Sequence, residues 1–145
     1  MIMRRQEISA AFLGITVALI LWLTILGRET QGGNILFYKP FHSISHLMKD
    51  IQRGGIKGNF LGNLILFVPV GVLVPLMTGW EKLWKTAAIG LGFSIFVETL
   101  QLITRKGVFD PDDLLLNTVG CVIGYGILRT IEKLFTKTDL NATGT

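Results

Sequence analysis

The sequence has little of what most soluble domains use to hold themselves together or to face water. Its 145 residues include one cysteine, Cys121, so no internal disulfide can form, and only two histidines. Charged residues make up 17% of the chain, whereas 50% is hydrophobic and the mean hydropathy is +0.54. Too few polar side chains remain to cover a water-facing surface, which favours a membrane protein. Cys121 itself is interpreted as a small residue that packs between helices.

Several functional classes also lack their usual signals. The net charge is +4, but no clustered basic stripe indicates nucleic-acid binding. His42 and His46 have the i, i+4 spacing of metal ligands, yet no HExxH frame or second cysteine accompanies them. No phosphate-binding loop or G-x-S-x-G motif is present either. We therefore expect neither a metal nor a cofactor.

Four long stretches carry almost no charge. A helix needs ~20 apolar residues to cross ~30 Å of hydrocarbon, and three stretches reach this length, with Glu98 as the one charge inside them. The fourth is shorter and uses Asp113 and Arg129 near its two interfaces. The sequence thus predicts an all-α membrane protein, a four-helix transmembrane bundle in one domain over residues 1–135, with a polar tail over 136–145. The helices are expected at about 8–27, 60–78, 84–104 and 112–131.

The orientation is argued from the ends of the first helix. Its apolar run is too long for a signal peptide and no small-x-small cleavage site follows, so we expect it to be retained. Four spans place both termini on one side, and the basic residues of the two sides are equal in number. Arg4 and Arg5 precede the first helix, which favours cytoplasmic termini. In the first loop, Ile44, Leu47, Met48 and Ile51 predict a short amphipathic interfacial helix.

Polar residues recur at helical spacing where the second and fourth predicted helices begin and the third ends. Side chains at offsets of three and four share a helix face. A charge at the centre of a span costs about 2.5–3.5 kcal/mol, so such groups usually face the interior. We expect one outer-leaflet pocket there, with Arg105 paired to Glu98 or Asp113, and no comparable set at the opposite ends. The spaced residues are Asn63, then Ser94, Glu98, Gln101 and Arg105, then Asp113, Asn117, Gly120 and Gly124.

Simpler explanations exist for part of this pattern. Amides in membrane helices often serve only as hydrogen bonds between helices. Asp112 or Asp113 is also well placed to cap the fourth helix. Gly120 and Gly124 form a G-x-x-x-G motif that would let a neighbouring helix approach closely.

Four segments follow one another in the order of a known family: PFHSI, NFLGNLILFVPVGVLVPL, FVETLQL and RKGVFDPDDLLLNTVGCVIGY. From Pro40 to Tyr125 the chain resembles the VanZ-like family of small bacterial membrane proteins. The resemblance implies a multi-pass protein of the bacterial cell membrane, linked to resistance to the glycopeptide teicoplanin. It also implies the motif residues Asn63, Glu98, Gln101, Arg105, Asp110, Asp113 and Asn117.

Three functions fit these features. The first is a binding or lipid-handling protein whose pocket holds a lipid headgroup or cell-wall precursor group, with membrane lipids and a lipid-linked precursor as partners. The second is an intramembrane enzyme in which Glu98 or Asp113 is the general base and Arg105 stabilises an anion. The third is a structural subunit of a larger complex. The sequence leaves the ligand and the oligomeric state open.

Overall fold

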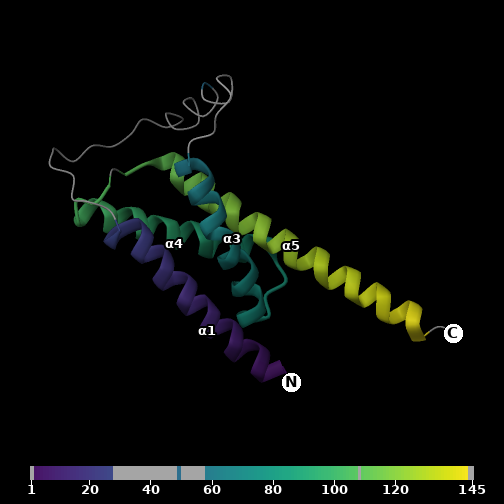
Figure 1. Cartoon of the computed structure of the whole chain (residues 1–145). Helices are drawn as coiled ribbons and strands as arrows, with labels where there is room; N and C mark the ends of the chain where they lie inside the picture. The colour runs from purple at the N-terminus through teal and green to yellow at the C-terminus, as the bar shows by residue number, and fades with distance from the viewer. Residues whose placement is uncertain (1, 28–48, 50–57, 108, 144–145) are drawn as a thin grey trace.

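The computed structural model describes residues 2–27, 49, 58–107 and 109–143 of the chain, and four long helices dominate it (Figure 1). All four are long and apolar enough to cross a membrane, which confirms the predicted all-α class and the number of spans. The elements are α1 (Ile2–Leu21), which continues into a π-helical turn η1 (Trp22–Leu26), then α3 (Gly58–Thr78), α4 (Leu83–Ile103) and α5 (Pro111–Thr143).

Two helices extend further than their apolar runs. α1 begins at Ile2 and α5 continues to Thr143, so the backbone of the expected polar tail is helical as far as that residue. A charge-free run marks the part of a helix suited to lipid, whereas Arg, Lys and Glu are also good helix formers and continue the helix beyond it. The amphipathic helix predicted in the first loop lies outside the described residues.

Both chain ends lie on the same side of the bundle (Figure 1). We call this side the terminal end, and the opposite side, where α4 ends and α5 begins, the far end. α1 and α4 therefore run towards the far end, and α3 and α5 run back. α3 stays helical through Pro69 and Pro75. Large apolar side chains such as Ile15, which is 64% exposed, cover the outside of the helices, as expected for surfaces in contact with lipid.

Glycines bring the backbones of α3 and α5 into direct contact. A Cβ atom at Gly71 would overlap the carbonyl oxygen of Cys121, and one at Gly124 would overlap that of Val68. Gly120 is equally close to the backbone of Leu64. The close approach predicted from the G-x-x-x-G motif is therefore present, and α3 is the partner helix.

The interior of the bundle is centred on the same crossing. Cys121 is fully buried beside Phe67 and Val97, and its Sγ atom donates a weak hydrogen bond to the Phe67 carbonyl oxygen at 3.5 Å. Ile20 brings α1 into this cluster. The lone cysteine is thus a packing residue, as the sequence indicated.

Candidate functional site

The buried face of α4 is largely polar. Glu98 is only 1% exposed and Gln101 only 3%, and both lie in the last two turns of the helix at the far end. Ser94, one turn earlier on the same face, is fully buried. Burying a carboxylate is unfavourable unless hydrogen bonds or charges compensate for the lost water. The polar face therefore requires partners from neighbouring segments.

α5 supplies several of them through its first turn. Asp110 precedes the helix and caps it, because Asp110 Oδ1 accepts a hydrogen bond from the Asp112 backbone N–H at 2.9 Å. The Asp110 carbonyl oxygen accepts a second from the Asp113 N–H at 3.1 Å. Pro111 occupies the first helical position, where its missing N–H has no cost. The N-cap is therefore Asp110, and not Asp112 or Asp113 as expected, whereas the predicted acidic first turn is present at these two residues.

Two hydrogen bonds join α4 to the start of α5. The Asp110 backbone N–H donates to Glu98 Oε2 at 3.1 Å, and Asn117 Nδ2 donates to Ser94 Oγ at 2.8 Å. Asp110, Asp112 and Asn117 are 6%, 0% and 3% exposed, respectively. We call the buried residues at this end the far-end polar cluster: Ser94, Glu98, Gln101, Asp110, Asp112 and Asn117.

One atom in the cluster has no partner. Asn117 Oδ1 is buried and accepts no hydrogen bond, although the other half of the same amide is bonded to Ser94. A buried amide oxygen without a donor is unfavourable, so this atom is a free acceptor for a donor group that approaches the cluster.

Arg105 lies just outside the cluster in an unusual backbone conformation. The end of α4 forms a Schellman motif, in which the Lys106 N–H donates to the Gln101 carbonyl oxygen and the Arg105 N–H to that of Leu102. This motif places Arg105 in the left-handed region with a φ of 55°, where glycine is usual. The Arg105 side chain is exposed.

The structure thus brings together some of the predicted site residues and separates others. Glu98, Gln101, Asp110 and Asn117 are buried together, whereas Arg105 is not part of the buried group. Asn63 and Asp113 are half-buried. The sequence placed Ser94 on the helix face of Glu98 but did not include it among the motif residues, and it indicated Asp112 only as a helix cap.

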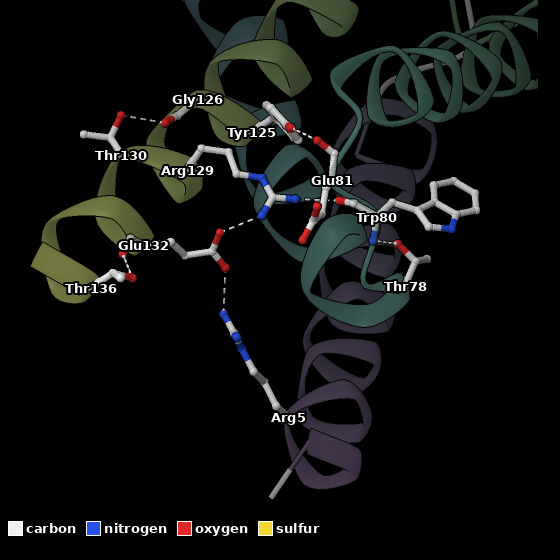
Figure 2. A network of polar contacts seen from close by, with 10 residues as sticks. All are labelled: Arg5, Thr78, Trp80, Glu81, Tyr125, Gly126, Arg129, Thr130, Glu132 and Thr136. Atoms are coloured by element: carbon white, nitrogen blue, oxygen red, sulfur yellow. Dashed lines mark hydrogen bonds and ion pairs between the residues drawn. The ribbon is translucent and has the colours of Figure 1, made fainter. Parts of the chain in front are cut away.

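The terminal end carries a polar network that the sequence did not lead us to expect (Figure 2). Arg129 donates to the Trp80 carbonyl oxygen and to Glu132 Oε2, each at 2.7 Å, and Arg5 forms an ion pair with Glu132 at 3.2 Å. The Tyr125 hydroxyl donates to the Glu81 carbonyl oxygen. The expectation that this end lacks a comparable set was wrong. Apart from the i, i+3 pair of Arg129 and Glu132, the contacts between the helices join residues far apart in sequence, which local spacing does not reveal. The network holds the α3–α4 turn against α5 and the start of α1.

The chemistry open to the far-end polar cluster is hydrogen bonding and charge pairing. Within the described residues, no three His, Cys, Asp or Glu side chains are grouped in a way that could hold a metal ion. His42 and His46 lie outside those residues. Within this cluster, the buried atom without a partner is the amide oxygen of Asn117, which can accept an N–H or O–H donor.

Fold and cluster together define the class: a small multi-pass helical membrane protein with buried acidic and amide side chains at one end. Comparison with known proteins then gives the family. The VanZ/LLP1 family model matches residues 12–133, and the chain belongs to this family. The chain is similar to Protein VanZ of Enterococcus faecium, with 26% identity over 123 residues that cover 83% of this chain and 74% of that protein. No solved structure matches the chain.

Proposed function

We propose that this protein binds the polar group of a membrane lipid or lipid-linked cell-wall precursor at the far-end polar cluster. The observation that supports this proposal is the Asn117 side chain, which is 3% exposed and keeps Oδ1 without a donor. The oxygen belongs to the far-end polar cluster, in which Asn117 Nδ2 is already bonded to Ser94 and Glu98 Oε2 to the Asp110 backbone N–H. A ligand for such a site carries donors, namely an amine or hydroxyl groups.

Arg105 supplies the second half of the proposal. An arginine in the left-handed region costs about 1–2 kcal/mol relative to glycine, and backbone strain of this kind concentrates at functional sites. The Arg105 side chain is exposed at the rim of the cluster, so its guanidinium group is available to a phosphate or carboxylate. A ligand with an anionic group next to a donor group, as in many lipid headgroups, would satisfy both features.

The family gives this binding a biological setting. The resemblance implies a link to teicoplanin resistance, and altered surface lipid or precursor chemistry would reduce the access of a glycopeptide to its target. This account requires the far end to face outwards and both termini to lie in the cytoplasm. The arginines before α1 favour that orientation.

The experiment compares matched carboxylate variants in membranes that express each to the same level. Glu98→Gln replaces a buried carboxyl group of the cluster with an amide, whereas Glu7→Gln makes the same chemical change at an exposed position of α1. Arg105→Ala and Asp113→Asn test whether the charged residues at the edge of the cluster contribute to binding. Lipids that copurify with each variant are identified by mass spectrometry, and teicoplanin susceptibility is measured alongside.

We expect Glu98→Gln and Arg105→Ala to lose a copurifying amine- or hydroxyl-bearing lipid and the resistance, and Glu7→Gln to keep both. If all four variants retain the lipid and the phenotype, the cluster is structural and the proposal is wrong. If a new lipid product accumulates only while Glu98 is intact, the protein is an intramembrane enzyme instead.

A further inference from the structure

Two contacts fix how α4 and α5 lie against each other. Ser94 is hydrogen-bonded to Asn117, and one turn towards the terminal end Gly90 lies against the Cys121 side chain. The two helices run in opposite directions, so the next level in the same register pairs Thr86 with Tyr125. We call this interface, from Ser94 and Asn117 to Thr86 and Tyr125, the α4–α5 seam.

Two buried polar atoms in the seam have no hydrogen-bond partner. One is Asn117 Oδ1, and the other is Thr86 Oγ1, whose residue is fully buried. Threonines elsewhere in the described helices, for example Thr78, Thr99 and Thr118, donate to the carbonyl oxygen four residues earlier. Thr86 makes no such bond.

We propose that the seam binds water at two levels, one beside Asn117 and one beside Thr86. Buried polar groups without a protein partner are characteristically satisfied by ordered water, which needs a polar site. Both levels meet this condition. At the Asn117 level the Ser94 hydroxyl and the amide lie together. At the Thr86 level the register brings Tyr125 opposite, and its hydroxyl is already bonded to the Glu81 carbonyl oxygen, which marks that level as polar.

The level of Gly90 and Cys121, between the two proposed water sites, has no room for water. A Cβ atom at Gly90 would overlap the Cys121 side chain, so the two helices touch there and leave no space for water. The Cys121 thiol donates its hydrogen bond to the Phe67 carbonyl oxygen on α3, so it offers no donor to a water molecule in the seam. Water therefore reaches Asn117 from the far end and Thr86 from the terminal end, and the Cys121 level separates the two.

Cysteine reactivity tests this arrangement in the full-length chain in membranes. In a Cys121→Ser background, Thr86→Cys and Asn117→Cys are compared with two controls on α4. Val97→Cys replaces an apolar residue that is 1% exposed, and Ile89→Cys replaces one that is 42% exposed on the outer surface. The probe is 2-aminoethyl methanethiosulfonate, which reacts with the thiolate, a species that forms readily only in water.

We expect Thr86→Cys and Asn117→Cys to react about tenfold faster or more than both controls. If they react as slowly as Val97→Cys, the seam is dry and the proposal is overturned. A membrane-impermeant analogue added to one side should reach Thr86→Cys only from the terminal side and Asn117→Cys only from the far side. Equal modification from both sides would overturn the closed level at Cys121.

A second measurement avoids introducing a cysteine. Thr86→Val keeps the shape of the side chain and removes the hydroxyl, and Thr99→Val does the same at an exposed position whose hydroxyl is already bonded. If the Thr86 hydroxyl had no hydrogen-bond partner at all, its removal would relieve an unfavourable buried polar group, and Thr86→Val would be more stable than the parent chain. We expect no rise in Tm because the hydroxyl is bonded to water, and a rise would overturn the Thr86 water site. The two Thr86 readouts do not involve the far-end polar cluster, so failure of the proposed function would leave them unchanged.

Discussion

The backbone N–H of Asp110 donates to Glu98 Oε2 across 3.1 Å, and this bond ties the start of α5 to the end of α4 inside the bundle. The carboxylate therefore has a structural role in addition to any role towards a ligand. Stability measurements can separate the two roles, because glutamine keeps an acceptor oxygen and alanine does not.

Glu98→Ala is expected to lower the free energy of unfolding by about 1–3 kcal/mol, since a buried donor loses its acceptor. Glu98→Gln should cost clearly less. The measurement is reversible unfolding in mixed micelles, with Glu7→Ala as the exposed control, for which a change within about 0.5 kcal/mol is expected. Equal losses for Ala and Gln would show that the Asp110 contact contributes nothing.

The Ser94–Asn117 hydrogen bond can be measured with a double-mutant cycle. Ser94→Ala, Asn117→Ala and the double variant should give a coupling energy of about 0.6 kcal/mol, the average for hydrogen bonds between membrane helices, and no more than about 1.7 kcal/mol. A control cycle of Asn117→Ala with Thr99→Ala, on the exposed face of α4, should give none. A coupling of zero in both cycles would contradict the bond at 2.8 Å.

The glycines of the bundle divide into two sets that give opposite predictions. Alanine at Gly71, Gly120 or Gly124 meets backbone atoms of the partner helix and should destabilise by about 1–3 kcal/mol or more. Alanine at the open helical positions Gly14, Gly92 or Gly126 should stabilise by about 0.5–1 kcal/mol through helix propensity. Thermal unfolding in detergent distinguishes the sets. If alanine at Gly92 lowered Tm as much as alanine at Gly71, the close backbone contact between α3 and α5 would be contradicted.

The two helix ends with a positive φ provide a reciprocal test. Arg105 has a φ of 55° and Gly79 a φ of 71°. Arg105→Gly removes the strain of the left-handed backbone but also gives the unfolded chain more conformational freedom, which opposes folding. The net effect should be a rise of about 0.5–1 kcal/mol in the free energy of unfolding. Gly79→Ala should lower it by about 1 kcal/mol or more. If Arg105→Gly also loses the copurifying lipid of the proposed function while the protein is more stable, the arginine is retained for binding and not for folding.

The sequence predicted those features that depend on local pattern. Charge-free runs located the four spans, and the offsets of three and four placed Glu98 and Gln101 on one buried face. The G-x-x-x-G motif indicated a close crossing, although only the fold shows that the partner is α3. Helix lengths were underestimated at both termini, because charged residues end an apolar run without ending a helix.

Features that depend on distant or competing contacts were harder to predict. Asp110 and Asp112 are equally good caps by composition, and the choice depends on which backbone N–H groups face which carboxylate. The Arg5–Glu132 pair joins residues 127 positions apart, so no local spacing reveals it. Arg105 shares a helical offset with Glu98, but the helix ends at Ile103, and the left-handed turn that follows directs the chain away.

The contact between Gly71 and the Cys121 backbone also restricts how the bundle can move. Where two main chains touch, neither helix can move closer to the other, and a tilt of α3 against α5 would pivot about that point. The pivot of such a tilt lies in the second half of α3 and in the first half of α5, so a much longer part of α5 extends from it towards the terminal end than towards the far end.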